Sequence, residues 1–234
     1  MGEDIKSDME RFRALGHSAF VMGYSGVSGT ALVKELSKAK LFKKVVLIGR
    51  REIPLDVGPE FEQRVVDFDK LDDHKDVFKD LDTGFCCLGV PSGGISEKDY
   101  TRITLDYVAS SAETAKEQGC KHFTIVTGQG VNKNSWFLFA RVKGELEEKL
   151  KQINFDRLSI FRPAKILYDS PNLPTSESIA RTLFKPIVYL FPTALSIQDE
   201  KFARAMINNA VKLPNPTVEE VYENKTIHQL AGDS

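Results

Sequence analysis

A glycine-rich turn between a short apolar segment and a helical pattern constrains the fold of this chain more than any other feature. The apolar segment comprises residues 18–22, and the turn after it reads Gly23-Tyr24-Ser25-Gly26-Val27-Ser28-Gly29. In a strand–turn–helix unit, the first glycine allows the tight turn, the second lets the backbone approach a pyrophosphate, and the third lets the helix pack closely on the sheet. Glycines also mark ordinary turns, but three at this spacing in a first such unit favour a dinucleotide-binding loop. The predicted contact residues of the loop are Gly23, Ser25, Gly26, Val27 and Gly29.

Strand patterns alternate with helical patterns beyond this turn, which predicts a mostly parallel sheet covered on both faces. Further strands are predicted at residues 44–48, 64–68, 84–88, 122–126 and 157–161. Helices are predicted at about residues 28–38, 72–79, 97–117 and 136–151.

The pattern becomes less regular after Pro163, where prolines recur and helices are predicted at about residues 176–189 and 199–211. No repeat or linker divides the chain, and 234 residues suffice for one α/β domain with a full core. We therefore predict a single Rossmann-type, doubly wound domain over residues 1–234. Its core would span about residues 17–165, and a small C-terminal cap of about residues 166–234 would lie over the carboxyl edge of the sheet.

The composition narrows the functional classes. Lys and Arg total 32 and Asp and Glu total 33, giving a formal net charge of −1. This balance offers no electrostatic basis for general binding to nucleic acid or to an anionic membrane. The three cysteines lack the pattern of a disulfide framework and the spacing of metal ligands, which favours a reducing compartment. The longest apolar stretch, residues 187–197, is too short to cross a bilayer, so we expect a soluble intracellular protein without a transmembrane segment.

The end of the second predicted strand bears on which dinucleotide is preferred. Sites that prefer NAD usually carry Asp or Glu there, which bonds to the ribose 2′-hydroxyl. This chain has Gly49-Arg50-Arg51 instead. A guanidinium can pair with a 2′-phosphate in bidentate fashion, so we predict NADP(H), with Arg50 the stronger candidate.

Three more residues at the same edge of the sheet are predicted cofactor contacts. Leu88 and Gly89 close the fourth predicted strand, and Asp67 follows the third. An adenine contact would suit Asp67, although a solvated loop aspartate fits its position equally well.

Seven segments spread along the chain carry a family resemblance. They are Leu47-Ile48-Gly49-Arg50-Arg51, Val65-Val66-Asp67-Phe68, Phe85-Cys86-Cys87-Leu88-Gly89, Gly119-Cys120-Lys121-His122-Phe123, Val142-Lys143-Gly144-Glu145, Phe161-Arg162-Pro163 and Glu223-Asn224-Lys225. Together they resemble the atypical branch of the short-chain dehydrogenases/reductases, and within it the oxidoreductase-like HIV Tat-interactive protein family, from about Phe20 to His228.

This resemblance implies NADPH binding and a cytoplasmic location, with the nuclear envelope or nucleus as a second place. It also implies a regulatory role in nuclear import, endosomal trafficking, apoptosis and transcription. The implied protein partners are nuclear transport or endosomal factors.

The catalytic residues of short-chain reductases do not all have counterparts here. Those enzymes use Tyr-x-x-x-Lys on one helix face, where the lysine ammonium lowers the pKa of a tyrosine that transfers the proton. Lys143 occupies the lysine position, but Phe139 stands four residues earlier in place of the tyrosine. Thr127 is a possible counterpart of the family's Ser or Thr. The lysine can still bind the nicotinamide ribose, whereas the phenyl ring cannot transfer a proton.

Other candidate acids and nucleophiles have simpler explanations. Tyr168 could reach a substrate loop, whereas packing explains Tyr100 and Tyr107, and His122 starts a strand at its amino end. Cys86 and Cys87 fit inert core thiols. Finally, Glu145, Glu147 and Glu148 are expected to form a solvated helix face.

Three hypotheses follow. The first is an NADPH-binding regulatory protein in which occupancy of the site sets the shape of the cap. The second is an NADPH-dependent reductase that takes its proton from solvent or substrate. The third, a structural scaffold with an unused fold, conflicts with the intact glycine loop.

Overall fold

The computed structural model describes residues 3–168, 194–213 and 219–232. A seven-stranded sheet of order β3-β2-β1-β4-β5-β6-β9 forms the centre, and every neighbouring pair in it is parallel. The strands are β1 (Ser18–Met22), β2 (Lys44–Gly49), β3 (Phe61–Val65), β4 (Thr83–Cys86), β5 (His122–Val126), β6 (Arg157–Arg162) and β9 (Glu219–Glu223). The strand order turns back between β1 and β4, as in the doubly wound fold, and ligands of such sheets bind outside the carboxyl ends at that point.

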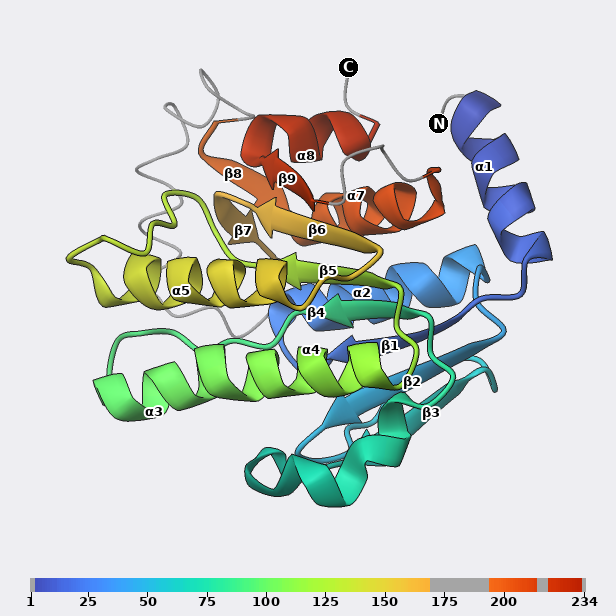
Figure 1. Cartoon of the computed structure of the whole chain (residues 1–234). Helices are drawn as coiled ribbons and strands as arrows, with labels where there is room; N and C mark the ends of the chain where they lie inside the picture. Colours follow the sequence, from blue (N-terminus) through green and yellow to red (C-terminus); the bar gives the residue numbers. More distant parts are fainter. Residues whose placement is uncertain (1–2, 169–193, 214–218, 233–234) are drawn as a thin grey trace.

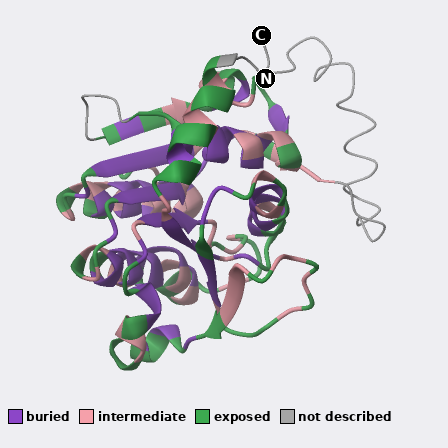
Figure 2. Ribbon diagram, turned by 90° about the vertical axis from the view of Figure 1, so that its right-hand side faces the viewer, coloured by how far each residue is buried: buried purple, intermediate pink, exposed green. Residues whose placement is uncertain are grey.

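Helices cover both faces of the sheet (Figure 1). One layer consists of the 3₁₀ segment η1 (Phe68–Phe78), α3 (Glu97–Thr101), η2 (Arg102–Asp106), α4 (Tyr107–Glu117) and α5 (Leu138–Gln152). The other layer consists of α1 (Glu3–Ala14), α2 (Val27–Ala39), α7 (Asp199–Val211) and α8 (Asn224–Leu230). Each layer packs on its own cluster of buried apolar side chains, and Figure 2 shows the strands between the layers as mainly buried.

Alternation along β1 explains why one strand serves both clusters. Phe20 and Met22 belong to the cluster under α4 and α5, whereas Ala19 and Val21 belong to the cluster under α2 and α7. Successive side chains of a strand point to opposite faces, so a strand buried on both faces has apolar residues throughout. The glycine of β4 completes the fit, because a Cβ at Gly84 would lie 2.3 Å from Phe20 Cζ.

The predicted Rossmann-type α/β fold is confirmed, with small changes in element bounds. Strand β3 lies three residues earlier than predicted, because Val66 and Phe68 are buried in the turn and the 3₁₀ segment that follow it. The helix predicted at 97–117 is continuous through a π-helical turn at Arg102–Asp106. The helix predicted at 176–189 lies outside the described residues.

The C-terminal region contributes more to the core than a cap would. Strand β9 adds an edge to the main sheet, and α7 packs beside α2. The short strands β7 (Lys165–Leu167) and β8 (Ser196–Gln198) form a separate parallel pair. Within the described residues, this region is therefore built into the sheet and one covering layer, while the predicted boundary near residue 165 stays a prediction.

Candidate functional site

The glycine loop is built for close backbone approach. Gly23 has a φ of +73°, and a Cβ there would lie 2.6 Å from the carbonyl carbon of Cys87. A Cβ at Gly29 would lie 2.2 Å from Gly23 O. Gly26 begins α2, which has no side-chain cap and no acidic residue in its first turn. The first N–H groups of α2 and its positive dipole end thus suit an anion.

The loop opens into a pocket of about 450 Å³ that also contains both arginines, and we call it the arginine pocket. Arg50 and Arg51 are exposed, and neither side chain has an ion pair or a hydrogen bond to the described part of the chain. Gathered here are the predicted contacts Gly23, Ser25, Gly26, Arg50, Arg51, Leu88 and Gly89, together with Tyr24, Gly49, Phe68, Cys87, Val90 and Ile103.

Asp67 lies apart from the residues that line this pocket. Its side chain is exposed and accepts a hydrogen bond of 3.1 Å from the backbone N–H of Asp69, which caps η1. The next residue, Phe68, does line the arginine pocket. Ile103, which sequence reasoning missed, reaches the pocket from the π-helical turn.

A second pocket, of about 560 Å³, adjoins the first and shares Gly26, Cys87, Leu88 and Gly89 with it. We call it the lysine pocket because Lys143 lines it. Its other lining residues are Val27, Ser28, Val126, Thr127, Gly128, Gln129, Phe139, Pro163, Ala164, Lys165 and Ile166. The structure therefore brings Val27, Thr127, Phe139 and Lys143 together beside the glycine loop.

Lys143 is held at the wall of the lysine pocket. Its Nζ donates a hydrogen bond of 2.5 Å to Thr127 O and lies 5.1 Å from the centre of the Phe139 ring. Burial lowers the pKa of Lys143 to about 8, and the neighbouring Glu147 offsets part of that effect. The Phe139 ring in turn packs on the backbone of Gly128, where a Cβ would lie 2.7 Å from Phe139 Cζ.

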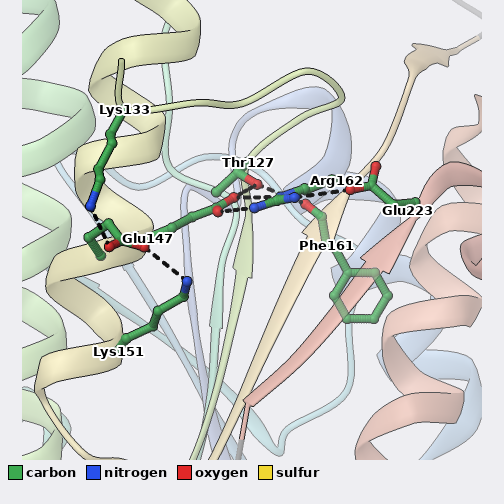
Figure 3. A network of polar contacts seen from close by, with 8 residues as sticks. Thr127, Lys133, Glu147, Lys151, Phe161, Arg162 and Glu223 are labelled. Atoms are coloured by element: carbon green, nitrogen blue, oxygen red, sulfur yellow. Dashed lines mark hydrogen bonds and ion pairs between the residues drawn. The ribbon is translucent and has the colours of Figure 1, made fainter. Parts of the chain in front are cut away.

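Thr127 is bound by a buried carboxylate that sequence reasoning missed (Figure 3). Its hydroxyl donates to Glu147 Oε1 at 2.7 Å. Arg162 donates to both oxygens of Glu147, through Nε at 3.1 Å and Nη2 at 2.6 Å, and pairs with Glu223 at 3.0 Å. Because Glu147 is only 2% exposed, the prediction of a solvated face was wrong for this residue. Glu148, by contrast, has a side chain that is 41% exposed and forms ion pairs with Lys133 and Lys151.

The position of Glu147 carried one signal in the sequence. It lies four residues after Lys143, so both side chains fall on one face of α5, the face that holds Thr127 from two sides. The i, i+4 spacing from Lys143 could therefore have distinguished Glu147 from Glu145 and Glu148, which do not have this spacing.

The other candidate acids and nucleophiles have the following surroundings. Burial raises the pKa of Cys86 to about 12 and that of Cys87 still further, so both stay protonated thiols. His122 is buried at the amino end of β5, 2.9 Å from Ser159 Oγ. Tyr168 lines a third pocket, of about 360 Å³, which is bordered by α2 and the start of α7 and shares Gly26 and Val27 with the lysine pocket. Tyr107 donates to Asp69 at 2.7 Å.

Among the described residues, no cluster of His, Cys, Asp and Glu side chains could hold a metal ion. None of the helices in the described part of the chain is long and apolar enough to span a membrane.

Comparison with solved structures agrees with the fold. MoeE5 in complex with UDP-glucuronic acid and NAD has a TM-score of 0.67 and 17% identity over 88% of this chain and 75% of that one. A UDP-glucose 4-epimerase has a TM-score of 0.68 and 15% identity over 91% of this chain and 80% of that one. At these identities the likeness concerns the fold alone.

Comparison with curated sequences reaches further. Protein HTATIP2 of Rattus norvegicus is 40% identical over 227 residues, which cover 96% of this chain and 93% of the relative. The mitochondrial FMP52-1 protein of Scheffersomyces stipitis is 30% identical over 76% of this chain and 79% of its own length. The mitochondrial FMP52 protein of Candida glabrata is 34% identical over 65% of each chain. No model of a known protein family matches the sequence.

These relatives correct one expectation and confirm another. The predicted cytoplasmic location, with the nucleus or nuclear envelope as second place, is contradicted by relatives that are named mitochondrial. Location therefore does not follow from the resemblance on which it was based. The resemblance itself is confirmed by the identity over nearly the whole length of the rat protein, and this chain belongs to the HTATIP2 family.

Proposed function

We propose that this protein binds NADP(H) across the arginine and lysine pockets. One observation carries the proposal: two arginine side chains without an ion pair or hydrogen bond to the described chain share a pocket with an intact glycine loop. Solved structures of the same fold, such as the MoeE5 complex, contain NAD. An aspartate or glutamate would favour NAD at the end of β2, and this chain has Arg50 there.

The residues present fit such a cofactor. The glycines leave a cradle that side chains would fill, and the first N–H groups of α2 would hold the pyrophosphate. Arg50, with Arg51 beside it, would bind the 2′-phosphate. Lys143 would hydrogen-bond the nicotinamide ribose from the wall of the adjoining pocket.

The role that we propose for this binding is regulatory. Phe139 has no proton to give, and the Thr127 hydroxyl is already donated to Glu147. The site thus keeps its cofactor-binding groups while the two usual reaction hydroxyls are missing or occupied. We propose that NADPH occupancy sets the shape of the C-terminal region. Protein partners, of the nuclear transport or endosomal kind that the family resemblance implies, would then respond to that shape.

A reductase is the second candidate, and the state of Lys143 favours it. When bound, NADPH supplies a hydride. With a pKa near 8, Lys143 could hold and release a proton at its Nζ, at the wall of a pocket large enough for a small substrate. Solvent or the substrate itself would otherwise provide the proton.

Calorimetric titration with NADPH and NADH tests the binding proposal. We expect NADPH to bind more tightly, and Arg50→Ala to weaken NADPH binding by about tenfold while leaving NADH binding nearly unchanged. Arg64→Ala is a matched control, since Arg64 is a half-exposed arginine of β3 paired with Glu62 and Asp76. A wild-type protein that bound neither cofactor would refute the proposal.

A reductase screen separates the two roles. Wild-type protein and Phe139→Tyr would be assayed for NADPH oxidation with flavins, quinones and aldehydes. The regulatory proposal predicts turnover only after the tyrosine is restored. Turnover by the wild-type protein, lost in Lys143→Met, would instead establish the reductase.

A further inference from the structure

The segment that carries Arg50 and Arg51 is tied to the glycine loop by a tyrosine of that loop. Tyr24 is 1% exposed, and its hydroxyl lies 2.7 Å from Arg51 O and 2.8 Å from Gln63 Oε1. Its one proton can go to either acceptor. A side chain from the first βα turn thus reaches the backbone of the segment after β2.

Gln63 completes this connection from β3. Its amide Nε2 donates to Ile53 O at 2.9 Å, and its Oε1 accepts from Ile53 N at 2.9 Å. The side chain therefore pairs with the Ile53 backbone as a neighbouring strand would. These hydrogen bonds hold the backbone of Arg51 and Ile53, while the side chains of Arg50 and Arg51 remain exposed.

Gly49 provides the space that this arrangement needs. A Cβ at Gly49 would lie 2.8 Å from Tyr24 Cε1, so the tyrosine ring occupies the place of a side chain at the end of β2. Ile53 also packs against the apolar cluster under α2. The segment is thereby held by hydrogen bonds and by packing, next to two cations that have no partner of their own in the described chain.

We propose that Tyr24 and Gln63 are positioning residues that set the preference for a 2′-phosphorylated dinucleotide. This inference rests on the proposed NADP(H) function and assigns part of its specificity to two side chains whose hydrogen bonds go to each other and to the backbone of Arg51 and Ile53. They hold the backbone of residues 51–53, and so keep Arg50 and Arg51 where the 2′-phosphate binds.

The two residues would act by changing how often the segment of residues 51–53 adopts its binding-competent arrangement. A segment that leaves its binding-competent arrangement lowers the apparent affinity by the fraction of time it spends elsewhere. Only ligands that contact the segment experience this loss. NADPH, which carries the 2′-phosphate, depends on Arg50 and Arg51, whereas NADH depends mainly on the glycine loop.

The experiment measures the ratio of NADPH to NADH affinity in Tyr24→Phe and in Gln63→Met. Tyr24→Phe keeps the ring that packs on Gly49 and removes only the hydroxyl. Gln63→Met keeps the length of the side chain and removes both bonds to Ile53. We expect each variant to lower the ratio by about fivefold to tenfold while NADH affinity stays within about twofold.

Tyr222→Phe serves as the control. Its hydroxyl donates to Asn209 at 2.8 Å at the far edge of the sheet, so its loss should leave the ratio unchanged. Circular dichroism and thermal unfolding establish whether each variant is folded. If Tyr24→Phe is not folded, the affinity ratio of Gln63→Met alone tests the proposal.

Each remaining outcome has a distinct meaning. A wild-type preference for NADPH that both variants retain would overturn this inference alone. Equal loss of NADPH and NADH would also overturn it, because the two residues would then support the whole site. A wild-type protein without any preference for NADPH would overturn the proposed NADP(H) specificity together with this inference.

Discussion

The arginine pocket and the lysine pocket differ in how their polar side chains are bonded. In the arginine pocket, Arg50 and Arg51 are exposed, and their side chains have no ion pair or hydrogen bond to the described chain. In the lysine pocket, Lys143 donates to the Thr127 carbonyl, and the Thr127 hydroxyl donates to Glu147. The arginine pocket thus has cationic side chains available to a ligand, whereas in the lysine pocket the polar groups are hydrogen-bonded to one another.

This difference separates binding from chemistry. A fixed backbone with free cations suits the recognition of a phosphorylated ligand, because little internal bonding has to be broken when the ligand arrives. Proton transfer needs a group within reach of the reacting atom and with a suitable pKa. Phe139 lacks such a group and the Thr127 hydroxyl is bonded to Glu147, so of these three residues only Lys143 retains that capacity.

The largest effect is expected at the buried carboxylate of the lysine pocket. Glu147→Leu leaves Arg162 without its main partner, and breaking a buried pair in this way usually costs 3–5 kcal/mol. We expect about 3 kcal/mol in the free energy of unfolding, since Arg162 keeps Glu223 and its side chain is 24% exposed. Urea denaturation measures it.

Two substitutions serve as controls for Glu147→Leu. Glu148→Leu removes a neighbouring carboxylate with two ion pairs at the surface and should change stability little. Arg50→Ala, in the other half of the site, should stay within about 0.5 kcal/mol of wild type. A Glu147→Leu protein as stable as these two would show that the network in the lysine pocket is not structural.

A smaller effect is expected in the glycine loop. In Gly29→Ala the new methyl group would meet Gly23 O at 2.2 Å and Tyr24 Cα at 2.7 Å, both backbone atoms that cannot turn aside. We expect a loss of about 2 kcal/mol in unfolding free energy and at least about tenfold weaker binding of both dinucleotides. Gly93→Ala is the control, because its methyl group would meet nothing within 4 Å. Unaltered binding in Gly29→Ala would contradict the close approach of loop and helix.

The smallest effect concerns the charge on Lys143. Its pKa in the folded protein is about 8, below the ordinary 10.5, so above pH 8 the unfolded chain binds more protons than the folded one. Wild-type stability should therefore rise relative to Lys143→Met between pH 8 and pH 9.5, by on the order of 1 kcal/mol, and the relative gain should disappear as pH falls through 8. A stability difference that did not vary over this range would mean that burial does not disfavour the ammonium.

The sequence predicted the central architecture because β1, β2, β5 and β6 are buried on both faces and read as apolar runs. Edge strands carry a weaker signal. Strand β3 is only partly covered, and its prediction fell three residues too late. Strand β9 contains three glutamates among its five residues, which is not an apolar run, and no strand was predicted there. Pairing with a neighbouring strand, rather than local composition, determines where such strands form.

The sequence predicted which residues gather around the site but not how their polar atoms are bonded. The spacing of Phe139 and Lys143 brought them to one helix face, as expected. The burial of Glu147, on α5, depends on Arg162, which lies fifteen residues further along the chain on strand β6. In the sequence, Tyr24 occupies a variable position of the glycine motif. Its hydrogen bonds to Arg51 and Gln63 are evident only in the folded structure. Contacts of this kind depend on the tertiary fold, and local patterns do not encode them.

Fragments of the cofactor test the difference between the two halves most directly. Adenosine 2′,5′-bisphosphate, adenosine 5′-monophosphate and reduced nicotinamide mononucleotide would be titrated separately as competitors of NADPH. We expect the bisphosphate to compete on its own, about tenfold better than the monophosphate, and the nicotinamide fragment to compete weakly or not at all. A nicotinamide fragment that competed as well as the bisphosphate would show that the lysine pocket, and not the arginine pocket, is the half prepared to bind.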